Sequence, residues 1–240
     1  MSSGAYVALS GLRARSAHLE RLATDIANGS TSGYKAERGT TSAAERPSFD
    51  KALKSAIDVT DGPDKYDFRN GALAATGRDL DFALEGPGFF VVQTDQGPRY
   101  TRNGHFNRGV DGSLVTEDGA AVLGESGPIK LGVGALSIAS DGTIRTGATA
   151  AGKLQVVDFP DYDGLSRESG ARFRAADPTK ATPAAATLVR AGAVEKSNVS
   201  MVERIAEMTE VSRTFEALQK GVSVLMNDIE GRAITELGRR

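Results

Sequence analysis

Residues 201–237 read MVERIAEMTEVSRTFEALQKGVSVLMNDIEGRAITEL. Apolar residues recur in this stretch every seven positions, in two series offset by three. The first series is Met201, Met208, Phe215, Val222 and Ile229, and the second is Val211, Leu218 and Leu225. Alternating steps of three and four are typical of a helix that packs against other helices. We therefore predict one long helix from about Ser200 to Leu237, with an apolar face that binds helical partners.

The N-terminal end repeats this pattern in a weaker form. Leu12, Leu19 and Ile26 are seven apart, but Arg15 interrupts the second series. Asn28-Gly29 ends the segment, because both residue types tolerate the left-handed conformation that closes helices. We predict a helix over residues 4–28. The candidate partner-binding residues of the two helices are Leu12, Leu19, Leu22, Ile26, Met208, Val211, Phe215, Leu218, Val222, Leu225 and Ile229.

Between the two ends the apolar period changes to two. Short apolar runs follow one another about every ten residues from Phe68, separated by turns such as Asp111-Gly112 and Asp141-Gly142. Asp-Gly is typical of tight hairpins, and such spacing is typical of a small all-β domain. The predicted strands are Asp81–Leu84, Gly88–Gln93, Arg99–Arg102, Leu114–Thr116, Ala121–Leu123, Ile129–Leu131, Leu136–Ile138, Thr143–Arg145 and Leu154–Phe159.

These patterns together predict the fold class and the domains. We expect an α+β protein in which long N- and C-terminal helices form a coiled-coil layer, with an all-β domain in the central part of the chain. Residues 1–35 and 190–240 would form the helical core and residues 68–189 the β domain. Residues 36–67 would be an extended connection, with a short helix around Phe49–Ile57.

Composition excludes several classes of protein. The chain has 240 residues, a formal net charge of −2 and no cysteine. Near-neutral charge without a basic patch argues against nucleic-acid binding, and the lack of cysteine excludes disulfides and thiolate metal sites. No window approaches the roughly 20 apolar residues of a membrane helix. Charged residues interrupt every apolar run of residues 1–27, so we expect a cytoplasmic protein or export without a Sec-type signal.

The sequence offers little for catalysis. Its two histidines, His18 and His105, lie far apart in different predicted elements. Asp79, Asp81 and Glu85 share one face of a predicted strand, which is the arrangement of an acid–base pair. We predict no catalytic, cofactor or metal site. Two alternatives stay open, namely an oligomeric carbohydrate-active β protein and a secreted filament protein.

Several stretches in one order resemble a known family. Leu22–Asn28 leads into Thr31–Lys35, and Thr76–Phe90 is followed by Tyr100–Phe106. Near the end, Gly192–Val199 precedes the long helix. Together these stretches resemble the signatures of bacterial flagellar rod and hook proteins over essentially the whole chain. Two positions depart from the family pattern, since Asp25 stands in place of an Asn and Gly29 in place of an apolar residue.

The resemblance implies a structural role rather than catalysis. It implies a subunit of the basal-body rod in the periplasm, which transmits motor torque, is exported through the flagellar type III apparatus and binds its own copies and other rod proteins. The opening Tyr6–Leu12 and the compact length resemble the proximal, FlgF-like branch, with the distal, FlgG-like branch as the alternative. The motif turn after the first helix, expected to fix the exit of that helix, comprises Asn28, Thr31, Gly33, Tyr34 and Lys35.

Overall fold

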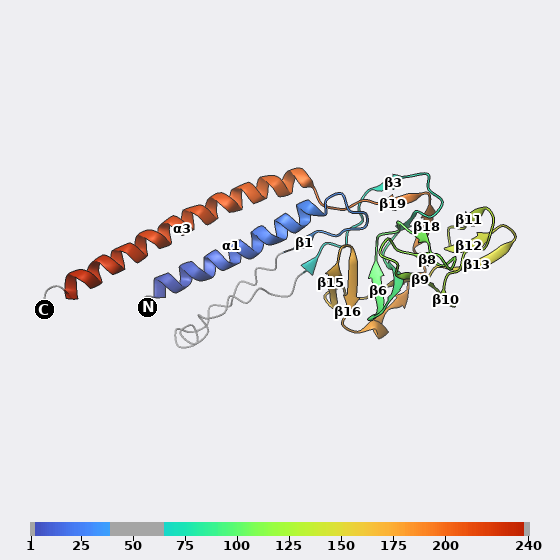
Figure 1. The fold of residues 1–240 in the computed structure, drawn as a ribbon, viewed down its shortest axis with the longest axis horizontal. Helices are drawn as coiled ribbons and strands as arrows, with labels where there is room; N and C mark the ends of the chain where they lie inside the picture. The colour runs from blue at the N-terminus through green and yellow to red at the C-terminus, as the bar shows by residue number, and fades with distance from the viewer. Residues whose placement is uncertain (1–2, 39–64, 238–240) are drawn as a thin grey trace. The chain divides into compact units, whose positions relative to one another are not determined.

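The structure is a computed structural model that describes residues 3–38 and 65–237, with side chains described over 11–38 and 65–224. The described chain separates into two compact units (Figure 1). The helical unit takes its residues from Met1–Ala27, Glu37–Lys65 and Ser200–Arg240, and the sheet unit comprises Asn28–Ala36 and Tyr66–Val199. The domain limits expected from the sequence remain a prediction, because compactness within one chain does not show that a part folds alone. Most of the predicted 36–67 connection, including Phe49–Ile57, lies outside the described residues.

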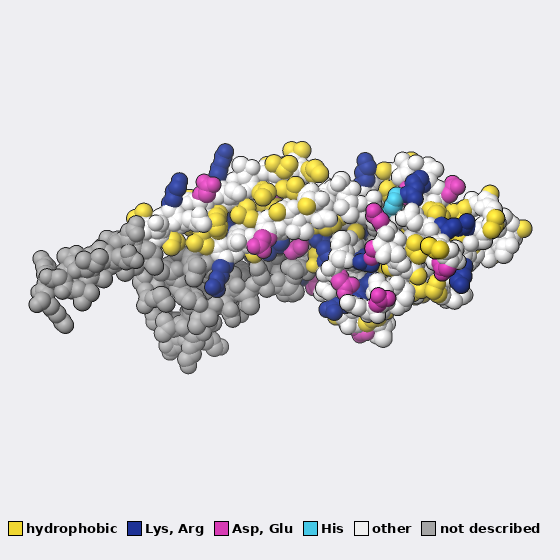
Figure 2. Space-filling model, viewed as in Figure 1, with side chains coloured by type: hydrophobic (Ala, Val, Ile, Leu, Met, Phe, Trp, Pro, Cys, Tyr) yellow, Lys and Arg dark blue, Asp and Glu magenta, His cyan; other side chains and the backbone are white. Residues whose placement is uncertain are grey.

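Among its described residues, the helical unit contains two α-helices that pack side by side (Figure 1). Helix α1 spans Ser3–Ala27 and helix α3 spans Met201–Leu237, with 25 and 37 residues. Leu22 on α1 and Val211 on α3 are 2 % and 4 % exposed and are the buried apolar residues of this pair. Figure 2 shows further apolar side chains at the surface along the helices.

The predicted fold class is wrong. We expected long terminal helices in a coiled-coil layer, but the described chain is largely β, with strands β1 to β19 and two α-helices. The helices also fail to close a coiled-coil seam. Of the nine predicted partner-binding residues with described side chains, two are buried, and Leu218 is 38 % exposed. The physical reason is that one neighbouring helix covers one strip of α3 only, while Arg15 interrupts the matching strip on α1 and is itself exposed.

The strands of the sheet unit are short and joined by tight turns. In chain order the strands of the chain are β1 Glu37–Arg38, β2 Lys65–Tyr66, β3 Leu73–Ala75, β4 Phe82–Glu85, β5 Phe89–Thr94, β6 Gly97–Thr101, β7 Asn107–Arg108, β8 Leu114–Val115, β9 Ala121–Gly124, β10 Gly127–Pro128, β11 Leu136–Ile138, β12 Thr143–Thr146, β13 Thr149–Lys153, β14 Val156–Asp158, β15 Leu165–Ser169, β16 Arg172–Ala175, β17 Thr182–Pro183, β18 Leu188–Ala191 and β19 Ala193–Glu195. A 3₁₀ turn at Pro178–Lys180 lies between β16 and β17.

The largest sheet has ten strands with the central order β15-β16-β6-β5-β9-β8-β7, and β10, β14 and β17 pair at its sides. β11, β12 and β13 form a separate three-stranded sheet, while β4 pairs with β18 and β3 with β19. Through these pairings, β18 and β19 at the end of the sheet unit lie beside β4 and β3 near its beginning. The predicted strand at Ile129–Leu131 is not formed, because the pairing strand β10 lies two residues earlier and Lys130 makes only an isolated bridge to Ser113.

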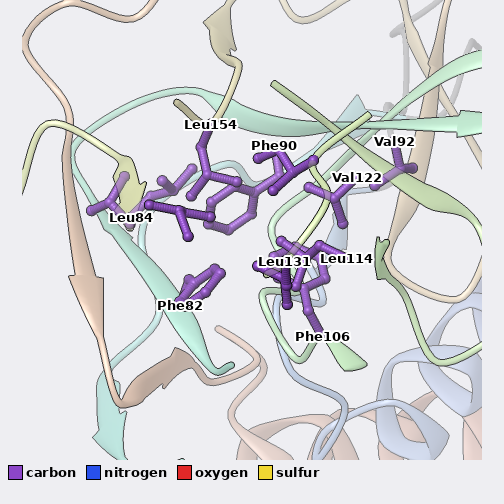
Figure 3. Close-up of a cluster of buried hydrophobic side chains, with 12 residues drawn as sticks. Phe82, Leu84, Phe90, Val92, Phe106, Leu114, Val122, Leu131 and Leu154 are labelled. Carbon is purple, nitrogen blue, oxygen red and sulfur yellow. The ribbon is translucent and has the colours of Figure 1, made fainter. Parts of the chain in front are cut away.

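Strand β5 divides the interior of the sheet unit into two apolar cores. Phe90 and Val92 point into one core, together with Phe82, Phe106 and Leu154 (Figure 3). Phe89 and Val91 point into the other, which is rich in aromatic rings. Successive side chains of a strand point to opposite faces, so a strand buried on both faces reads as an unbroken apolar run. This is why the sequence Phe89-Phe90-Val91-Val92 lacks alternation.

Candidate functional site

The loop after α1 begins with a compact turn. The Thr31 backbone N–H donates to the Asn28 carbonyl at 3.0 Å, and the Thr31 hydroxyl donates to the Asn28 side-chain oxygen at 3.3 Å. Gly33 follows with a φ of +69°, and a Cβ placed there would lie 2.2 Å from the backbone nitrogen of Asn103. The loop therefore approaches the backbone of the sheet unit at a point where only glycine fits.

Tyr34 anchors the loop through an arginine of the sheet unit. The ring is fully buried, and the Arg167 guanidinium lies over it at 4.1 Å from the centroid. Arg167 also donates to the Tyr34 hydroxyl at 2.7 Å and to the Lys35 carbonyl. The same guanidinium lies 4.6 Å from the ring centroid of Tyr66. A stacked, hydrogen-bonded arginine of this kind binds both the polar and the apolar parts of a tyrosine.

Lys35 lies at the centre of a buried ionic cluster. Its Nζ donates to Glu195 Oε1 at 2.5 Å and to the Arg69 carbonyl at 2.8 Å. Glu195 Oε1 also accepts from the backbone N–H of Gly71 at 2.8 Å, and its Oε2 accepts from Arg102 Nη1 at 3.2 Å. The Lys35 and Glu195 side chains are 0 % and 1 % exposed. One carboxylate thus balances two cations away from water.

Burial shapes the acid–base chemistry of this cluster. Desolvation lowers the pKa of Lys35 below its usual value, and Glu195 opposes that shift. Desolvation likewise lowers the pKa of Arg102, again against the attraction of Glu195. Arg102 is further held by a hydrogen bond to the Gly86 carbonyl at 2.8 Å and lies 5.6 Å from the centroid of Phe89. The cluster holds its charges in place rather than presenting them to a substrate.

Asn198 links the loop to the end of the sheet unit. Its side-chain oxygen accepts from the Ala36 backbone N–H at 2.8 Å, while its side-chain nitrogen donates to the carbonyls of Asp67 and Arg69 at 2.6 Å and 3.1 Å. The Gly33 N–H donates to the backbone carbonyl of Glu195 at 2.7 Å. The segment leaving α1 and the segment entering α3 are therefore bound to each other within the sheet unit.

A second polar network lies within the helical unit. Asp25 is 1 % exposed, and its carboxylate faces Arg204 Nε at 3.1 Å and accepts from the Glu37 backbone N–H at 3.1 Å. Arg204 also binds Glu207 at 2.8 Å, and Glu207 faces His18 Nε2 at 3.1 Å. Asp25 is one of the two positions that depart from the family pattern, and Arg204 supplies a cation for its charge.

The structure brings together the motif turn but not all the predicted helix residues. Tyr34 and Lys35 are buried with Gly33 between the turn and the sheet unit's chain. Met208, Phe215 and Val222 on α3 are half-buried, as are Leu12, Leu19 and Ile26 on α1. The side chains of Leu225 and Ile229 lie outside the described part. Sequence analysis gave no role to Arg102, Arg167, Glu195, Asn198 or Arg204, although Arg102, Glu195 and Asn198 lie within motifs that it quoted.

The carboxylates that suggested an acid–base pair have other partners. Asp81 is buried and faces His105 Nδ1 at 2.9 Å and Arg78 at 3.3 Å, and Glu85 binds Arg190 at 2.9 Å. Asp79 is exposed. Within the described part of the chain, no cluster of three or more acidic or histidine side chains could hold a metal ion. No helix among those residues is both long and apolar enough to cross a membrane.

Comparisons with known proteins first define the class. The model described as the flagellar hook protein FlgE/F/G D1 domain matches residues 83–146, in the sheet unit. The model described as the flagellar basal body rod FlgEFG protein C-terminal matches residues 190–225, from β18 into α3. The chain is thus of the flagellar hook and rod class.

Whole-chain relatives then give the particular family. The chain is 33 % identical to the flagellar basal-body rod protein FlgF of Rhizobium meliloti, over 99 % of both chains. It is 31 % identical to FlgF of Caulobacter vibrioides over 92 % of both. It is 28 % identical to the rod protein FlgG of Buchnera aphidicola, over 91 % of this chain and 94 % of the relative. The chain belongs to the flagellar basal-body rod protein family. It is a structural subunit of the rod and not an enzyme, and it associates with other rod components.

Proposed function

We propose that this subunit joins the rod through apolar residues that α3 leaves exposed. Val202 is 80 %, Ile205 is 52 % and Val224 is 68 % exposed, and helical spacing places them on one side of α3, away from the strip with Val211 that packs on α1. Large apolar side chains gathered on one helix are typical of protein-binding surfaces. The single observation that carries the proposal is this second, uncovered set of apolar residues on α3. Its partners would be copies of this chain and other rod proteins.

The ionic cluster supports a mechanical role. Lys35 follows α1 by eight residues of sequence and Glu195 precedes α3 by six, so their salt bridge at 2.5 Å joins the two connections that lead to the helices. Both connections join a helix covalently to the sheet unit, so a load on either helix reaches the sheet unit along the chain there. Separating a buried ion pair costs more than separating an exposed one, because each charge would be left desolvated without its partner. This supports a subunit that transmits torque in the periplasmic rod.

We assign the chain to the proximal, FlgF-like position, with export through the flagellar type III apparatus. Support for the position comes from relatives named FlgF that align over 92 % and 99 % of this chain. The distal, FlgG-like position is the competing assignment, supported by a relative named FlgG at 28 % identity. Site-specific cross-linking in isolated basal bodies distinguishes them. A proximal subunit cross-links to a FlgG-type protein on one side only, whereas a distal one cross-links to hook-side components.

The assembly proposal is tested by Val224→Asp in a motile host lacking the wild-type gene. Because Val224 is already 68 % exposed, the charge leaves the monomer folded but opposes burial against a partner. We expect loss of motility and no incorporation of the variant into purified basal bodies. The matched control is Gln219→Asp, five residues earlier on α3 and also exposed, but on another side of the helix. Normal rods from Val224→Asp would refute the proposed surface.

A further inference from the structure

The β11–β12 hairpin separates two unusual surfaces of the sheet unit. At the end where β11 begins and β12 ends, Val110 and Val133 are 111 % and 99 % exposed. The two loops that carry them are joined, since Arg108 donates to the Gly132 carbonyl and the Leu131 N–H donates to the Gly112 carbonyl at 2.8 Å. We call this surface the valine tip and define it by Arg108, Val110, Asp111, Lys130 and Val133.

The second surface is a groove at the other end of the hairpin. It has a volume of about 480 Å³ and is lined by Asp141 of the hairpin turn, by Val156 and Pro183, and by Leu188, which is 49 % exposed. Glu125 and Lys153 also line it, are exposed and are paired at 2.8 Å. The groove thus combines several apolar lining residues with a few charged ones, which is the usual composition of a site that accepts an apolar side chain.

The charges of the two surfaces indicate that the groove binds the valine tip. The valine tip carries two exposed cations, Arg108 and Lys130, and one exposed anion, Asp111. The groove carries two exposed anions, Glu125 and Asp141, and one exposed cation, Lys153. The net charges are opposite, which favours encounter of the two surfaces.

The two surfaces cannot meet within one chain. Leu136 pairs with Thr146 at the valine end of the hairpin, and Ile138 pairs with Ile144 toward the turn that holds Asp141. The hairpin therefore holds the tip and the groove apart. A contact between them must join two molecules.

We propose that the valine tip of one copy of this chain inserts into the groove of the next copy. The contact is head-to-tail, because each copy binds the next copy through its valine tip and the preceding copy through its groove. Contacts of this kind do not pair off and can extend into an open helical array. The inference rests on the proposed function, since it names the contact between sheet units that would accompany the contact through α3.

The chain contains no cysteine, so any disulfide must form between cysteines that have been introduced. Disulfide cross-linking of single-cysteine variants therefore tests the contact directly. Val133→Cys and Leu188→Cys proteins are mixed in equal amounts and oxidised by oxygen with copper phenanthroline, which forms one disulfide from two thiols. We expect a cross-linked dimer of twice 25.1 kDa in the mixture and little dimer from either variant alone. A chain carrying both cysteines should form a ladder of multimers. Ser166→Cys, exposed on β15, is the matched control and should cross-link with neither.

Two further results separate this inference from the proposed function. Raising the salt from 0.05 M to 0.5 M should lower the yield of the mixed dimer several-fold, because the charges on both surfaces are exposed and screened. Dimers of Val133→Cys with itself at the yield of the mixture would overturn the head-to-tail contact. So would Val133→Asp protein that incorporates into basal bodies as the wild type does, although the rod function would then stand. Wild-type chain absent from basal bodies would instead overturn the proposed function.

Discussion

Replacing Glu195 by Gln should lower the free energy of unfolding of the sheet unit more than replacing any single exposed residue does. The substitution keeps the shape of the side chain but removes the charge that balances Lys35 and Arg102. The side-chain nitrogen of Gln is a donor, so it would face the N–H groups of one of these cations. Both cations are buried, so water cannot replace the lost carboxylate.

The magnitude follows from the geometry of the cluster. Removing one member of a buried ion pair costs about 3–5 kcal/mol, because the remaining charge stays desolvated. Glu195 serves two cations, at 2.5 Å and 3.2 Å, and also accepts from the Gly71 N–H. We therefore expect the loss in free energy of unfolding to lie within or above that range. At a denaturant slope of about 2 kcal/mol/M, the urea midpoint would fall by about 2 M.

Tyrosine signals report the sheet unit specifically. The chain has no Trp and five Tyr, of which Tyr34, Tyr66, Tyr100 and Tyr162 belong to that unit. Near-ultraviolet circular dichroism during urea unfolding therefore follows its tertiary structure. An unchanged denaturant slope would show that the native and unfolded states keep their compactness.

Lys35→Met is the companion variant. It removes one cation and leaves Glu195 paired with Arg102, so we expect a smaller loss than for Glu195→Gln. The double variant should lose less than the sum of the single losses, because the two side chains interact directly. A loss below about 1 kcal/mol for Glu195→Gln, or a larger loss for Lys35→Met, would refute this account of the cluster.

Other residues give further tests. Gly33→Ala should cost more than about 3 kcal/mol in urea unfolding, because the new Cβ meets the Asn103 backbone at 2.2 Å in addition to the strain of a φ of +69°. Its control, Gly77→Ala at a φ of +72° with open space around it, should cost about 1 kcal/mol, and equal losses would contradict the close approach. Arg204→Met should lower the thermal midpoint of helix content because it removes a guanidinium that pairs with the buried Asp25 carboxylate, while Arg213→Met on the exposed side of α3 should not. Burial, and a hydrogen bond to Asp158, raise the pKa of Tyr162 to about 12. Absorbance at 295 nm should therefore show one tyrosine ionising near pH 12 that Tyr162→Phe removes. Because the pKa of that tyrosine is about 10 in the unfolded chain, its stabilising effect should be complete below pH 10 and be lost as the pH rises through 12.

The sequence predicted individual helices and strands better than it predicted the contacts between segments that are distant in the chain. Apolar spacing correctly indicated helix over most of α1 and α3, and the run Phe89–Val92 indicated a buried strand. The coiled-coil layer was wrong because spacing shows which face of a helix is apolar and not how much of that face a single neighbour covers. The ionic cluster could not be predicted, since Lys35 and Glu195 are 160 positions apart and neither has a periodic pattern. Asp25 appeared only as a departure from a family pattern, because its partner Arg204 lies on the other helix.

The salt bridge between Lys35 and Glu195 also sets an order of events for the chain as it folds. Contacts across 160 residues form late, since most of the intervening chain must be present before the ends can meet. A chain that emerges with its N-terminus first holds Lys35 unpaired until β19 has followed it. The anchor of the first helix is therefore completed by nearly the last part of the sheet unit to arrive. A subunit that has been delivered only in part cannot form this salt bridge, so the two connections that lead to its helices stay unlinked and the chain has no finished shape with which to enter an assembly.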